Sequence, residues 1–111
     1  MSAIQKHAIQ AKYIESSQTT QYTASNVIAR IDNITISNPT ALSATFSLSI
    51  VPSGGSVSAS NTIYTTKTVL AGEVFLCSGL WGKILNSGEF ISAIAGTSSA
   101  LVIDASVTEI S

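Results

Sequence analysis

The chain has 111 residues, of which 45% are hydrophobic and only 10% are charged, and its formal net charge is −1. This length fits one domain, while a typical soluble domain carries roughly 25% charged residues. So little net charge provides no field that attracts nucleic acid or an anionic membrane. A surface with few charges favours association. We therefore expect the chain to form a homodimer or another homo-oligomer; the alternative is a monomer kept in solution by Ser and Thr.

Residues 1–26 differ from the rest of the chain, because their apolar residues follow no regular period. Short strands over 8–15 and 19–23 are compatible with this segment. We expect an N-terminal arm, loose in isolation or ordered against a neighbouring subunit, or else a pair of edge strands. A β-sandwich domain is expected over residues 27–111.

A two-residue period begins after position 26. In the segment 44–51, Ala44, Phe46, Leu48 and Ile50 alternate with polar Thr and Ser, which predicts a strand with one buried face. In the segment 27–36 the apolar period changes phase between Ile31 and Ile34, which predicts a β-bulge near Asp32-Asn33.

Further strands are expected over 62–70, 74–77, 89–95 and 100–108, separated by turns at 37–40, 52–55, 71–73, 86–88 and 96–99. A short helical turn or an irregular crossover is expected over 78–85. The total of about seven or eight short antiparallel strands predicts an all-β, single-domain β-sandwich, either jelly-roll-like or immunoglobulin-like. The single Cys77 excludes the Cys–Trp–Cys signature of immunoglobulin domains.

Residues able to perform chemistry are few and scattered. His7 is the only histidine and is expected to be solvated, and Cys77 is expected to be a buried strand residue. Glu73 and Glu89 follow turn glycines and are expected to begin strands. The sequence therefore predicts no enzyme, no metal site and no cofactor.

Trp81 is the one large amphipathic aromatic residue. It could anchor an interface, but its apolar neighbours favour a plug at the end of the sandwich. No stretch approaches the roughly 20 apolar residues that span a membrane, and the N-terminus lacks the pattern of a secretory signal. We therefore expect synthesis and folding in a cytoplasm.

Three segments carry a resemblance to a known group of proteins: Leu48–Gly55 (LSIVPSGG), Ala71-Gly72-Glu73 and Gly82–Ala95 (GKILNSGEFISAIA). Their order and spacing resemble small virion proteins of tailed phages, most of all the capsid decoration (cement or staple) proteins of short-tailed phages. The resemblance covers roughly residues 27–110. It implies a jelly-roll-like protein, without catalytic residues, that binds the outside of the capsid and clamps neighbouring major capsid subunits, commonly as a homodimer.

Contacts with such partners are expected from residues 1–26, here called the leader, from the loop after residue 51 and from the tryptophan. The residues are Ile4, Ile9, Tyr13, Ile14, Pro52, Ser53, Gly54, Gly55 and Trp81. The alternative function is a phage tail or receptor-binding module that grips a host glycan. An enzyme is a distant third hypothesis, because no general base is in evidence.

Overall fold

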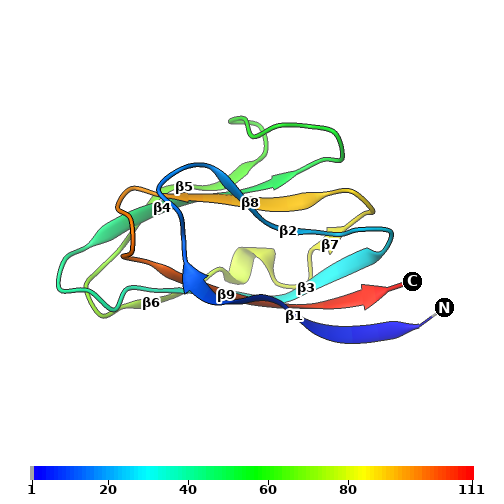
Figure 1. The fold of residues 1–111 in the computed structure, drawn as a ribbon, viewed down its shortest axis with the longest axis horizontal. Coiled ribbons are helices and arrows are strands. Elements are labelled where there is room, and N and C mark those ends of the chain that lie inside the picture. The colour runs from blue at the N-terminus through cyan, green and yellow to red at the C-terminus, as the bar shows by residue number, and fades with distance from the viewer. Residues whose placement is uncertain (1) are drawn as a thin grey trace.

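The computed structural model describes residues 2–111, which form an all-β sandwich of two antiparallel sheets. The strands are β1 (Ala3–Tyr13), β2 (Thr19–Thr23), β3 (Ile28–Ser37), β4 (Ala44–Val51), β5 (Thr62–Val69), β6 (Val74–Leu76), β7 (Ile84–Leu85), β8 (Phe90–Ala95) and β9 (Val102–Ile110), with a 3₁₀ turn η1 (Ser78–Leu80). The two layers face each other along the whole length of the molecule (Figure 1).

The order of the strands is that of a jelly roll. One sheet, here called the β9 sheet, has the order β1-β9-β3-β6, with β7 also paired to β3; the other, the β8 sheet, has the order β2-β8-β4-β5. This arrangement results when a long antiparallel hairpin is rolled up, because β1 then pairs with β9, β2 with β8, β3 with β6 and β7, and β4 with β5. The expected fold class is confirmed.

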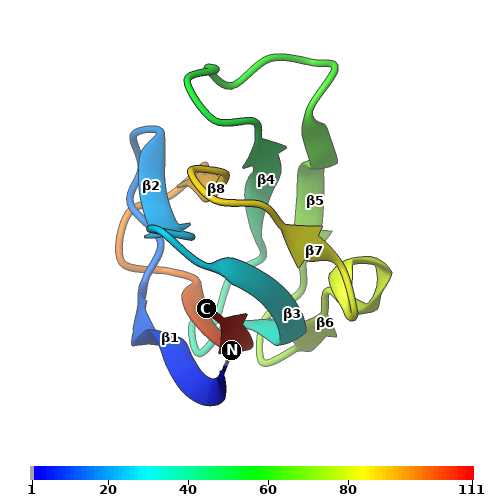
Figure 2. The same cartoon turned by 90° about the vertical axis from the view of Figure 1, so that its right-hand side faces the viewer.

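Residues 1–26 do not form a separate arm in the part of the chain that the structure describes. β1 is the edge strand of the β9 sheet and β2 is the edge strand of the β8 sheet, on the same side of the molecule (Figure 2). Ile9, Ile14 and Tyr22 contribute their side chains to the common core. The sequence hides this because β1 has register shifts on both sides of Ile9, which interrupt its two-residue period.

The core is filled from both sheets. In β3, Ala29, Ile31, Ile34 and Ile36 are fully buried, and the change of phase between Ile31 and Ile34 coincides with a register shift against β9 at Asp32. The predicted bulge is therefore confirmed. The other buried side chains include Phe46, Leu48, Val69, Leu80, Leu85, Ile91, Leu101, Ile103 and Val107.

The segment after β6 differs in one respect from expectation. Leu80 and Leu85 fill the core between the sheets, and Cys77 is fully buried as predicted. Trp81, however, remains 43% exposed, so it does not plug the sandwich. The 3₁₀ turn explains the difference, because it directs Leu80 inward and leaves the next residue outside.

Asn38 ties together the loops at one end of the sandwich. Its buried Nδ2 donates to the carbonyl oxygens of Leu42 (2.8 Å) and Val69 (3.0 Å), and its Oδ1 accepts from the amide and hydroxyl of Thr40 (3.0 and 2.7 Å). The loop between β3 and β4 is thereby fixed to the end of β5.

The variant Asn38→Ala is expected to lower the free energy of unfolding by about 2–3 kcal/mol, because it leaves the buried carbonyl of Val69 without the amide donor. Urea denaturation followed by circular dichroism measures this. Asn86→Ala, which removes an exposed amide from another turn, is the matched control and should change stability by less than about 0.5 kcal/mol. Equal effects of the two variants would contradict the role of Asn38.

Candidate partner-binding surface

The residues considered for chemistry have structural roles in this fold. The carboxylates of Glu73 and Glu89 accept hydrogen bonds from the amides of Leu70 and Asn86 (both 2.8 Å), so each closes the turn that precedes its strand. Among residues 2–111, no group of three or more His, Cys, Asp or Glu side chains is placed to hold a metal ion. Within the same residues, no helix has the length and apolar character needed to cross a membrane.

Exposed apolar side chains concentrate along one edge of the β9 sheet, formed by β6, η1 and β7. Val74 and Leu76 point outward from β6 on either side of Phe75, which packs against the core, and Ile84 points outward from β7. Leu70 precedes this edge and Trp81 lies within it. We call these five side chains the apolar edge strip: Leu70, Val74, Leu76, Trp81 and Ile84, which are 43–60% exposed.

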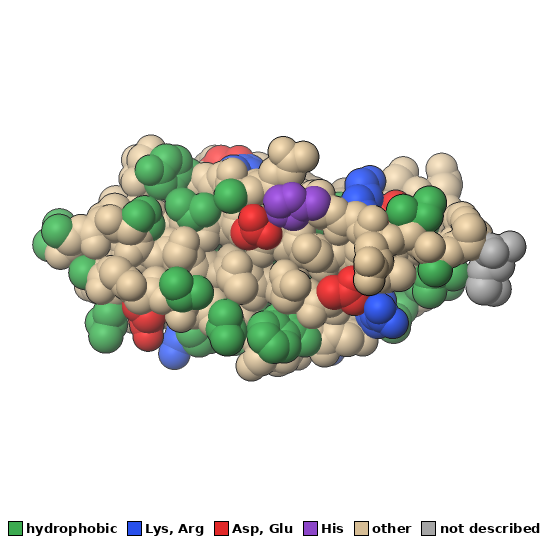
Figure 3. Space-filling model, turned by 90° about the horizontal axis from the view of Figure 1, so that it is seen from below, with side chains coloured by type: hydrophobic (Ala, Val, Ile, Leu, Met, Phe, Trp, Pro, Cys, Tyr) green, Lys and Arg blue, Asp and Glu red, His purple; other side chains and the backbone are tan. Residues whose placement is uncertain are grey.

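The backbone along this edge is held by β3. The amide of Cys77 donates to the carbonyl of Ile34 (3.0 Å), and the amide of Gly82 donates to that of Ile31 (2.6 Å). The apolar side chains therefore stand on a continuous part of the sandwich and do not hang from a loose loop. In the view onto the outer face of the β9 sheet, hydrophobic side chains line the lower border of the molecule (Figure 3).

Charged and polar side chains lie further in on the same face and contact one another. The Arg30 Nε donates to Asp32 Oδ1 (3.0 Å), and His7 Nε2 lies 3.0 Å from Asp104 Oδ1. The hydroxyl of Thr108 donates to Asp32 Oδ2 (2.8 Å). These contacts join β1, β9 and β3 across the outer face.

The outer face of the β8 sheet has a different character, since it is covered with hydroxyl groups that bond to one another and to the backbone. Ser49 Oγ lies 3.0 Å from Thr62 Oγ1, and Ser47 Oγ accepts from the amide of Thr66 (2.9 Å). Ser92 Oγ accepts from Gln18 (2.8 Å). The two faces of the sandwich are thus chemically distinct.

Polar contacts also hold the leader to the rest of the fold. The pKa of Glu15 lies below its usual value because Gln21 and Lys12 donate hydrogen bonds to its carboxylate. The pKa of Tyr22 is raised by burial and by the carboxylate of Glu109, which accepts a hydrogen bond from the phenol. These bonds connect β1 to β2, and β2 to β9.

The structure distributes the predicted contact residues over several parts of the surface. Ile4, Tyr13, Trp81 and the loop Pro52, Ser53, Gly54 and Gly55 are exposed. Ile9 and Ile14 are buried in the core, so neither side chain is available to a partner, and their assignment to the contact surface is corrected. Ile9 points inward from β1, and Ile14, just after β1, is held against Leu101 by a backbone hydrogen bond of 2.8 Å.

Only Trp81 of the apolar edge strip was expected to contact partners; the other four residues were not, namely Val74, Leu76, Ile84 and Leu70. A signal for the first two was present in the sequence, because Val74-Phe75-Leu76 in a three-residue strand must place one apolar side on the outside. Ile84 carried no such signal, since its direction depends on pairing with Arg30.

No family model matches the chain, and neither the curated proteins nor the solved structures contain a significant match to it.

Proposed function

We propose that this protein is a non-enzymatic structural protein of a phage virion that binds the outer surface of the capsid and clamps neighbouring major capsid subunits. The observation that carries the proposal is the apolar edge strip on a sandwich with few charges. The resemblance of residues 27–110 to capsid decoration proteins supports the same function. The protein would be made in the host cytoplasm and would act on the exterior of the assembled head.

The apolar edge strip suits adhesion to a protein surface. Burial of apolar area contributes about 25 cal/mol per Å², and much of that gain offsets the loss of translational and rotational freedom on association. One strip therefore supports a modest affinity. Many copies on a symmetric shell, or a homodimer with two strips, would strengthen attachment through multivalency.

The edge itself offers a second means of attachment. In the described part of the chain, residues 2–111, β6 pairs only with β3, so its other side is open to an added strand. A partner strand could bond to this backbone while its side chains meet Val74 and Leu76.

The proposal is tested with purified protein and phage heads that lack it. We expect the protein to co-sediment with the heads and, when labelled, to cover the whole shell in electron micrographs. The variant Leu76→Ser should weaken binding about tenfold through the loss of one buried leucine side chain. Ile63→Ser, which changes a side chain of similar exposure on β5, is the matched control and should bind normally.

Absence of the protein from heads, or label confined to a single vertex, would overturn the assignment to the capsid. The single-vertex result would favour the tail or receptor-binding alternative. Both variants should unfold at the same urea concentration as the natural chain, because exposed substitutions change stability by less than about 0.5 kcal/mol.

A further inference from the structure

Strand β9 is flanked by a β-bulge in each of its neighbours, β1 and β3, and both bulges lie beside Ser106. In β1, two residues, His7 and Ala8, lie between the partners of Val107 and Ala105, where β9 has only Ser106. In β3, Asp32 is the extra residue between the partners of Val107 and Ser106. Bulges re-aim side chains and are frequent beside functional sites. Here two of them spread the outer face on either side of Ser106.

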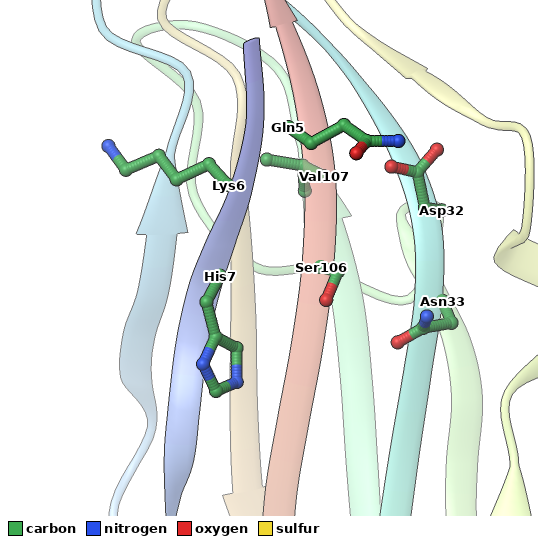
Figure 4. Close-up of a pocket in the computed structure, with 7 residues that line it drawn as sticks. All are labelled: Gln5, Lys6, His7, Asp32, Asn33, Ser106 and Val107. Carbon is green, nitrogen blue, oxygen red and sulfur yellow. The ribbon is translucent and has the colours of Figure 1, made fainter.

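The two bulges open a hollow of about 390 Å³ on the outer face, lined by Gln5, Lys6, His7, Asp32, Asn33, Ser106 and Val107. Figure 4 shows the side chain of Gln5 reaching across β9 toward Asp32, while Asn33 points toward Ser106. Lys6 points away from the hollow toward β2 and bonds to Glu109 (3.4 Å). The hollow is therefore lined mainly by uncharged polar groups and one carboxylate.

The polar groups in the hollow divide into fixed and free ones. Asp32 is fixed by Arg30 and Thr108, and His7 is fixed by Asp104. Within residues 2–111, the side chains of Gln5, Asn33 and Ser106 form no hydrogen bond with other parts of the chain. Two amides and a hydroxyl thus face the hollow with donors and acceptors that are available to a ligand.

The composition of the hollow selects the chemistry of that ligand. The carboxylate of Asp32 disfavours an anion, and its pairing with Arg30 leaves little net charge to attract a cation. Adjacent hydroxyl groups suit the site well, because each hydroxyl both donates and accepts, as the amides of Gln5 and Asn33 also do. We propose that this hollow binds one residue of a neutral saccharide through its vicinal hydroxyl groups.

The site is independent of the apolar edge strip. The strip follows β6, η1 and β7, whereas the hollow lies over β1, β9 and β3. A protein attached along the strip would keep the hollow accessible, so that a decorated surface could also adhere to carbohydrate. A variant can therefore lose capsid binding and keep saccharide binding, or the reverse, so the two proposals are tested independently.

The experiment is a titration of isotope-labelled protein with D-glucose, D-galactose and N-acetyl-D-glucosamine, followed by amide chemical shifts. At least one sugar should shift the amides of Gln5, Asn33 and Ser106, with an affinity in about the millimolar range expected for a small open site. Asn33→Ala and Gln5→Ala should each weaken binding about fivefold or more, since each removes one pair of polar contacts.

Gln10→Ala is the matched control, because Gln10 is an exposed glutamine on the same strand outside the hollow. It should leave the sugar affinity unchanged. The proposal is overturned if none of the three sugars shifts these amides, or if Asn33→Ala and Gln5→Ala bind as the natural chain does. All three substitutions are at exposed positions, and an unchanged amide spectrum away from the hollow verifies that each variant is folded.

Discussion

Replacing Phe46 by alanine is expected to lower the free energy of unfolding by about 3–5 kcal/mol, which is the cost of deleting a large buried aromatic side chain. Phe46 is 1% exposed and extends from β4 toward the opposite sheet. Its ring centroid lies 6.0 Å from that of Tyr64 on β5 and 5.9 Å from that of Phe75 on β6. The side chain therefore joins the two sheets, and its loss leaves a cavity between them.

Urea denaturation followed by circular dichroism tests this expectation. Phe46→Leu is the control, because it keeps most of the apolar volume and should cost less than half as much as the alanine variant. A loss below about 1 kcal/mol in Phe46→Ala would contradict the bridging role, since that is the average effect of any substitution. Domains of this kind are stable by only about 5–15 kcal/mol, so the alanine variant approaches the limit of folding.

Alkaline solution is expected to lower the free energy of unfolding of the protein, in part through Cys77. Burial raises the pKa of the Cys77 thiol from an ordinary value of about 9 to about 12. Between these two values the thiol ionises in the unfolded chain and stays protonated in the folded one, so the unfolded state binds fewer protons. The free energy of unfolding should then fall as pH rises from 9 to 12, by up to roughly 1 kcal/mol per pH unit.

The measurement is a series of urea denaturation curves between pH 7 and pH 11, with Cys77→Ala as the control. The alanine variant lacks the thiol and should show a shallower decline above pH 9. Some decline should remain, because the raised pKa of Tyr22 acts in the same direction above its ordinary value near 10. Parallel curves for the two proteins would show that Cys77 does not couple to stability.

The sequence predicted the strands correctly wherever one face of a strand is buried and the other is exposed to solvent. The strand at 44–51 and the bulge at Asp32 could be predicted from the alternation of apolar and polar residues, and the burial of Cys77 from its place in an apolar run. The leader could not be resolved in the same way. Its pairing partners, β8 and β9, lie about 70–100 residues away, and its register shifts obscure the period.

Neither the apolar edge strip nor the hollow could be predicted from the local pattern of apolar and polar residues. The apolar edge strip depends on which strands end at the edge of the sheet, as the unexpected exposure of Trp81 and Ile84 illustrates. The hollow depends on two bulges meeting at Ser106 from different strands. The bulge in β3 could be predicted, because the apolar period changes phase at Asp32. The bulge in β1 could not, because the polar residues around His7 show no apolar period whose phase could change.

The position of β9 determines how late in synthesis the molecule can become complete. β9 lies between β1 and β3, so β1 has no partner within this sheet until β9 has been synthesised. Contacts so distant in sequence are characteristic of slow folding. Nascent chains will therefore carry an unpaired β1 until β9 emerges, and the folding yield should depend on how well β1 is shielded during that interval.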